Sequence, residues 1–125
     1  MNSNKFTIKS QEALQQAQQI AQSFGQQQLE NEHIFKGILE VDENVTPFIL
    51  KKLNVNVELF KKVLDSAIQN FPKVSGGDIM FSREAGTMVN EAEIIAKKMN
   101  DEFVSIEHLI LAIFKSKSKV SQILK

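Results

Sequence analysis

The sequence contains no cysteine, no tryptophan and no tyrosine. Without cysteine the chain can form neither a disulfide nor a thiolate metal site, and it has no cysteine nucleophile. All nine aromatic residues are phenylalanine. Their rings bring apolar area without a hydroxyl or an indole donor, so we expect them to serve in packing or in apolar contact.

An excess of charge of either sign is also missing, because 15 lysines and arginines stand against 15 aspartates and glutamates. Such a balance gives no field that would draw the chain to nucleic acid or to a membrane surface, and neither is expected as a partner. No apolar run has the length of a signal peptide core or of a membrane span. We therefore expect a cytoplasmic protein that folds as one domain over residues 1–125 and is monomeric.

Proline and glycine are scarce, with two and five residues. Apolar residues recur at spacings of three and four, as they do on one face of a helix, which predicts an all-α fold. The first helix should begin near Ile8 with Thr7 as its N-cap and stop at Gly25, and Asn56 should cap another helix. The remaining pattern predicts helices at about 32–40, 47–53, 57–69, 88–99, 106–114 and 120–124.

The chain repeats itself at a constant offset of 75 residues, which indicates a duplicated helical unit. Residues 6–70 form the first predicted repeat of about four helices, residues 71–80 a linker with Pro72, Gly76 and Gly77, and residues 81–125 the second repeat. The identical pairs are Phe6 and Phe81, Ala17 and Ala92, Ile20 and Ile95, Ala21 and Ala96, Glu32 and Glu107, His33 and His108, Ile38 and Ile113, and Val45 and Val120.

The second repeat is predicted to be truncated. Lys125 aligns with Leu50, so the second repeat stops before its counterpart of the helix at 57–69. We expect the natural domain to continue past Lys125 with that helix, which would cover apolar residues of the second repeat. The candidates for the uncovered surface are Phe114, Ile123 and Leu124.

Several segments resemble the N-terminal domain of Clp ATPases, and the resemblance covers essentially the whole chain. They are Lys5-Phe6-Thr7, Ser10-Gln11-Glu12-Ala13-Leu14, Glu32-His33, Pro72-Lys73-Val74-Ser75-Gly76-Gly77 and Ser105-Ile106-Glu107-His108-Leu109. The Glu-His pair is shared by several Clp ATPases. The Pro-Lys-Val-Ser-Gly-Gly linker is similar to the ClpB type in particular.

The resemblance implies a chaperone of the stress response, in which a mobile N-terminal domain is joined to a hexameric ring of two AAA+ ATPase modules. The implied function is to engage unfolded or aggregated polypeptide, which the ATP-driven ring then threads. The implied partners are therefore such proteins and the ring of the same chain. ATP and magnesium would belong to the ring, and we expect no cofactor here, because no glycine is followed by the lysine that a G-x-x-x-x-G-K-[ST] phosphate loop requires.

Three residues match positions that the ClpB family uses for substrate handling, namely Thr7, Asp101 and Glu107. Each also has a structural interpretation, because Thr7 can cap a helix, Asp101 can close the turn after Asn100, and Glu107 can oppose a helix dipole. A groove for unfolded chains should be apolar and adaptable, which adds the candidates Met80, Phe81, Met88 and Phe103. The phenylalanines at helical spacing are assigned to packing instead, namely Phe6, Phe24, Phe48 and Phe60.

Other functions are weighed against these assignments. The pairs Glu32-His33 and Glu107-His108 do not suggest a metal site, because neighbours on a helix point about 100° apart. Instead each glutamate should complement the helix dipole and each histidine should bond nearby backbone. No nucleophile and base pair is visible, so no catalytic residue is predicted. The alternative function is that of a ClpC or ClpA type N-domain, which docks adaptors or recognises phosphoarginine through the duplicated carboxylates.

Overall fold

The computed structural model of the chain describes residues 3–74, 77–116 and 120. These residues form six α-helices with almost no strand, which confirms the all-α fold. The elements are η1 (Ser3–Lys5), α1 (Ile8–Ser23), β1 (Gln28–Leu29), α2 (Asn31–Val41), α3 (Val45–Lys52), α4 (Val57–Gln69), β2 (Met80–Phe81), α5 (Arg83–Lys98) and α6 (Ile106–Lys115).

The helix ends follow the local signals in the sequence. The Thr7 hydroxyl accepts the Ser10 N–H at the start of α1, and Asn56 caps α4 in the same way. Helix α3 begins earlier than predicted, because the Asp42 carboxylate accepts the backbone N–H groups of Val45 and Thr46. The helix predicted at 120–124 lies outside the described residues except for Val120. No helix in the described part of the chain is long and apolar enough to span a membrane.

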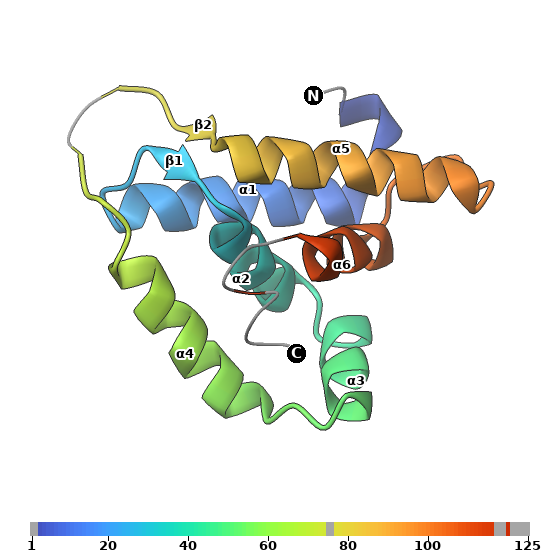
Figure 1. Ribbon diagram of the computed structural model, residues 1–125, viewed down its shortest axis with the longest axis horizontal. Coiled ribbons are helices and arrows are strands. Elements are labelled where there is room, and N and C mark those ends of the chain that lie inside the picture. Colours follow the sequence, from blue (N-terminus) through green and yellow to red (C-terminus); the bar gives the residue numbers. More distant parts are fainter. Residues whose placement is uncertain (1–2, 75–76, 117–119, 121–125) are drawn as a thin grey trace.

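Two very short parallel pairings join the predicted repeats, and neither was predicted from the sequence. Leu29 of β1 pairs with Phe81 of β2, and Phe6 pairs with Val104 in an isolated bridge. The second pairing has the same relationship as the first, because Phe6 corresponds to Phe81 and Leu29 to Val104 at the offset of 75. In both cases, the segment before the first helix of one repeat pairs with the segment before the second helix of the other repeat. Figure 1 shows β1 and β2 together at the start of α5.

The core differs between the two repeats where their first two helices cross. Helices α1 and α2 approach closely at Gly37, where an added Cβ would lie 2.4 Å from the Ala13 carbonyl oxygen. The corresponding residues between α5 and α6 are Ala112 and Met88, which are both larger. A cavity of about 470 Å³ lies along this second seam, with Met88 and Ala112 in its lining. The second repeat is thus packed less tightly at this crossing.

Packing of the phenylalanines is as predicted for some positions and not for others. Phe6 and Phe60 are buried in the core, and Phe24 packs against it. The prediction for Phe48 is wrong, because its side chain is 61% exposed. Helix α3, which carries it, lies with α4 on the side of the molecule away from α5 (Figure 1). Phe114 is partly buried, and Ile123 and Leu124 lie outside the described residues.

Candidate functional site

The turn between α5 and α6 has a fixed shape. Asn100 follows the end of α5 with a left-handed φ of 60°, as Gly25 does after α1 with a φ of 69°. Asparagine is among the residues that tolerate this conformation best after glycine. The Asp101 N–H then donates to the carbonyl oxygen of Ala96, at 2.9 Å. This turn sets the position from which the Asp101 side chain reaches α6.

Asp101 is tied to the first turn of α6 through His108. The Nδ1 atom of His108 accepts the Ser105 backbone N–H at 2.8 Å, so the ring proton lies on Nε2. That Nε2–H donates to Oδ2 of Asp101 at 2.8 Å. Ser105 and His108 form a reciprocal cap at the helix start. The predicted bond from the histidine to neighbouring backbone is confirmed, and the Asp101 side chain is held in place while about half of it stays exposed.

The first repeat has the same arrangement with an uncharged partner. His33 accepts the Glu30 N–H at Nδ1, and its Nε2 lies 2.6 Å from Oε1 of Gln26. Burial lowers the pKa of His33 from 6.5 to about 4, so this ring is neutral at physiological pH. The Gln26 amide also donates to the Ile68 carbonyl oxygen at the end of α4. The first-repeat network therefore ends on the Ile68 carbonyl oxygen, whereas the second-repeat network ends in a partly exposed carboxylate.

Four of the predicted site residues gather at this end of the molecule. The Thr7 N–H donates to the Val104 carbonyl oxygen at 3.0 Å, which places Thr7 beside the segment that carries Asp101, Phe103 and Glu107. The Thr7 hydroxyl is already used in capping, since it also donates to Oγ of Ser10. The Asp101, Phe103 and Glu107 side chains are exposed.

The other three predicted residues lie elsewhere. Met80 and Phe81 precede α5, whereas the turn follows it, and a helix of 16 residues separates the two places by about 24 Å. Met88 lies within α5 and is only 2% exposed, so it forms part of the wall of the α5–α6 seam and not an open surface. The seven residues therefore do not form one groove.

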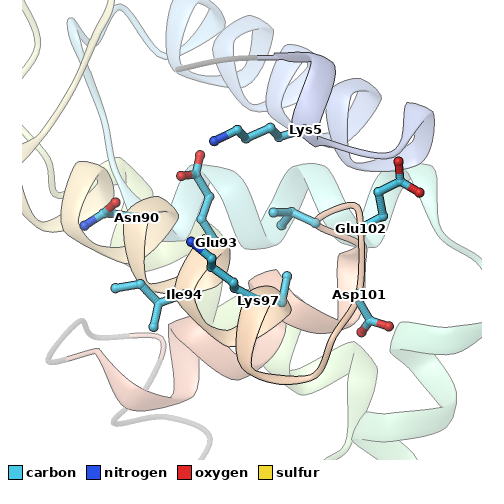
Figure 2. Close-up of a pocket in the computed structure, with 9 residues that line it drawn as sticks. Lys5, Asn90, Glu93, Ile94, Lys97, Asp101 and Glu102 are labelled. Carbon is cyan, nitrogen blue, oxygen red and sulfur yellow. The ribbon is translucent and has the colours of Figure 1, made fainter.

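A cavity of about 380 Å³, lined mostly by charged residues, lies between η1, the second half of α5 and the turn. In Figure 2 the side chains of Lys5 and Glu93 point toward one another across it, while Asp101 and Glu102 point outward from the turn. The lining residues are Lys5, Asn90, Glu93, Ile94, Ala96, Lys97, Asp101, Glu102 and Val104. Most of these residues were not predicted as a site.

A signal for these missed residues was present in the repeat. Glu93 and Lys97 replace Gln18 and Gln22 of the first repeat, and Asp101 and Glu102 replace Gln26 and Gln27. Positions where one copy is charged and the other is neutral are not explained by a shared core. A comparison of the two copies for charge, instead of for apolar character, would have found the cavity wall.

Three exposed apolar side chains belong to the second half of α5, to its C-cap and to the turn that follows it. Ile94, Met99 and Phe103 are 40%, 55% and 45% exposed. Ile94 lines the cavity, and the other two belong to the end of α5 and the turn. We call the surface formed by Ile94, Met99, Asp101, Glu102 and Phe103 the α5–α6 corner. It combines apolar contact area with carboxylates on a turn of fixed shape.

The described residues contain no group of three or more histidine, aspartate or glutamate side chains placed to hold a metal ion. At the α5–α6 corner, the Asp101 carboxylate accepts a hydrogen bond from His108, and Glu102 is exposed to solvent. Such an arrangement suits reversible contact with another polar and apolar surface.

Known proteins resemble the chain over its whole length. The ClpB chaperone of Bacteroides thetaiotaomicron is 50% identical over 125 residues, and that of Porphyromonas gingivalis is 39% identical over the same length. The chain covers 14% of the length of each of these relatives. Among solved structures, the N-terminal domain of Hsp104 from Candida albicans superposes with a TM-score of 0.86 at 18% identity, covering 95% of this chain and 79% of that one.

The model of the Clp repeat (R) N-terminal domain matches residues 5–125. The match includes both Glu-His pairs, the linker and the turn that carries Asp101. The solved structure shares the fold of this chain at low identity, and the two ClpB chaperones align with it along all 125 residues at 50% and 39% identity. The chain belongs to the Clp N-terminal domain family and is of the ClpB type.

Proposed function

We propose that the chain is the substrate-engaging domain of a ClpB-type disaggregase and that it binds non-native polypeptide at the α5–α6 corner. The observation that carries this proposal is the exposure of Ile94, Met99 and Phe103 on the second half of α5 and the turn after it, two elements that also contribute charged side chains to a cavity. Non-native chains present apolar side chains together with charged ones. A surface that offers both kinds of contact fits such a partner better than it fits a single small molecule.

The binding should be weak. The corner is small and partly polar, so a single domain gains limited affinity for an unfolded segment. In a hexamer several such domains would act on one client, and multivalency would raise the overall affinity without new contacts. We therefore expect a dissociation constant in the micromolar range or above for the isolated domain.

The role that we propose is binding without catalysis. ATP and magnesium would act in the AAA+ ring of the full-length protein. The curated relatives are long enough to contain such a ring, because this chain covers only 14% of their length. None of the five glycines of this chain precedes a lysine, so a phosphate loop is missing from the sequence. Calorimetry with ATP should give no saturable heat, and saturable binding would contradict this part of the proposal. The cytoplasmic location also stays a prediction.

The alternative function, phosphoarginine recognition as in a ClpC or ClpA type N-domain, has weaker support. It uses the duplicated carboxylates Glu32 and Glu107 as a matched pair. Glu32 is buried, and its Oε2 accepts the backbone N–H of Val120 at 3.2 Å. Of these two glutamates, only Glu107 is exposed. A guanidinium would therefore meet one accessible carboxylate of the two.

An affinity measurement with matched variants tests the proposal. Phe103→Ser removes an exposed ring from the corner, and Phe48→Ser removes an exposed ring from α3, outside it. We expect unfolded casein to bind Phe103→Ser several-fold more weakly, roughly the effect of losing about 1 kcal/mol of apolar contact. Phe48→Ser should bind as the parent does. Equal loss in both variants, or no loss in Phe103→Ser, would place the binding surface elsewhere.

A further inference from the structure

The cavity at the α5–α6 corner has a counterpart in the first repeat. A cavity of about 630 Å³ is lined by Gln18, Gln22, Gly25, Gln26 and Gln27. At the offset of 75 these residues correspond to Glu93, Lys97, Asn100, Asp101 and Glu102, and four of these five line the cavity of the second repeat. The two cavities therefore occupy equivalent places in the fold.

Residues of the linker form part of the wall of the cavity of the first repeat. Val74, Gly77, Asp78 and Ile79 take part in its lining. The Val74 backbone N–H donates to the Gly25 carbonyl oxygen at 2.9 Å, and the Met80 N–H donates to that of Gln27, also at 2.9 Å. The linker thus shows how a polypeptide segment binds here, with its backbone as the donor.

The second repeat presents the same acceptor without this donor. Asn100 takes the place of Gly25, and both residues have left-handed backbone after a helix end. Within the described part of the chain, no backbone N–H donates to the Asn100 carbonyl oxygen.

The charge of the two cavities differs. Four glutamines of the first repeat are replaced by three carboxylates, Glu93, Asp101 and Glu102, and by one ammonium group, that of Lys97. Lys5, which replaces Met80, faces Glu93 (Figure 2), and Asp101 is bonded to His108. Glu102 points outward and is exposed. The excess of carboxylate favours a segment that carries a lysine or an arginine.

We infer that the cavity at the α5–α6 corner binds a segment of polypeptide backbone that carries a basic side chain. A backbone N–H of the segment donates to the Asn100 carbonyl oxygen, as Val74 does to Gly25, and the basic side chain lies near Glu102 and Glu93. This inference rests on the proposed function and names the substrate class for it. It concerns polar recognition of the backbone, in addition to apolar contact at the rim.

A peptide with the sequence of the linker, Phe-Pro-Lys-Val-Ser-Gly-Gly-Asp, is a suitable probe because it contains both the basic residue and the donor. Amide-shift titration of the domain should perturb Lys97 to Glu102. A peptide with N-methyl-valine lacks the donor and should bind roughly three- to tenfold more weakly. A peptide with glutamate in place of its lysine should lose roughly three- to tenfold as well.

The matched protein variants are Glu93→Gln and Glu102→Gln, which install the first-repeat residues at equal size. They should remove most of the difference in affinity between the lysine and glutamate peptides, while Asp78→Asn in the linker should not.

Equal binding of the N-methylated peptide, or shifts confined to residues 18–27, would overturn the inference. If casein binds at the corner while the three peptides bind alike, the proposed function stands without this mode. Loss of casein binding with the peptide preferences intact would overturn the proposed function alone.

Discussion

His108 donates its Nε2–H to Oδ2 of Asp101, at 2.8 Å, from the first turn of α6 to the turn that precedes it. The same bond joins His33 to Gln26 in the first repeat, 75 residues earlier. In each repeat the histidine caps its own helix through Nδ1 and fixes the preceding turn through Nε2. The geometry of the α5–α6 corner therefore depends on a buried ring and not only on exposed residues.

Asp101 should be replaceable by another acceptor but not by an apolar residue. Asp101→Asn keeps an oxygen for the His108 Nε2–H, as Gln26 does for His33, and should change the free energy of unfolding by less than about 0.5 kcal/mol. Asp101→Ala leaves that buried donor without a partner and should cost about 1–2 kcal/mol. Urea unfolding of the two variants measures the difference, and equal stability would show that the bond contributes little.

Acid should destabilise the domain through His33 before it protonates most carboxylates. The folded pKa is about 4 and the ordinary value is 6.5, so the unfolded chain binds the proton more tightly. Protonation of His33 therefore does not affect the free energy of unfolding above pH 6.5. Below that pH it lowers the free energy of unfolding, by about 3 kcal/mol in all once the pH has fallen to 4. Imidazole shifts of the folded domain should show no His33 titration near pH 6.5. A titration there would mean that the ring is accessible or otherwise charged.

A separate loss of stability is expected at lower pH through Asp42. Burial alone raises the pKa of Asp42, but hydrogen bonds from the Thr46 hydroxyl and from three backbone N–H groups together lower it below its ordinary value of 3.8. This contribution is present above pH 3.8 and is lost as the pH falls through the lower folded pKa. Asp42→Asn should remove this part of the acid response and leave the His33 part unchanged.

The crossing of α1 and α2 should not tolerate a methyl group. Gly37→Ala places a Cβ 2.4 Å from the Ala13 carbonyl oxygen, and backbone on both sides leaves little room to shift. We expect a loss of about 1–3 kcal/mol in the free energy of unfolding. Gly86→Ala is the control, because a Cβ there meets no atom within 4 Å, and it should gain up to about 1 kcal/mol from helix propensity. Equal melting temperatures of the two variants would contradict the close approach.

Asn31 should be a site of easy stabilisation. Its side chain is 1% exposed, and neither its oxygen nor its amide nitrogen has a hydrogen-bond partner among the residues that the structure describes. The corresponding residue of the second repeat is Ile106, which is buried and apolar. Asn31→Ile should therefore raise the free energy of unfolding by about 1 kcal/mol. A lower melting temperature would indicate that a partner such as a bound water satisfies the amide.

The helices could be predicted because their signals are local. Thr7 and Asn56 cap helices directly after loops, and the apolar spacing that follows each cap is that of a helix. The β1–β2 pairing could not be predicted, because a strand of two residues shows no alternation. Phe48 was assigned to packing for its spacing, but no helix in the described residues covers the outer face of α3.

The candidate site was only partly predictable. The resemblance identifies Asp101 as a candidate substrate-binding residue, and the sequence pattern indicates that His108 bonds to nearby backbone. The hydrogen bond between Asp101 and His108 could not be predicted, because the relative position of their two segments depends on the turn at Asn100. The sequence groups Met80 and Met88 with Phe103 because they are apolar and lie in or near the linker and the second repeat. Their separation follows from the straight length of α5, which periodicity does not convey.

The most direct test of the central claim is an amide-shift titration of the domain with an unfolded polypeptide such as casein. We predict saturable shifts centred on Ile94, Met99 and residues 101–103, with few shifts in α3 and α4. The double charge reversal Asp101→Lys and Glu107→Lys should weaken binding several-fold, provided that its melting temperature shows it to be folded. Shifts centred on the exposed face of α3 around Phe48, or unchanged binding by a folded double variant, would contradict the assignment of substrate contact to the α5–α6 corner.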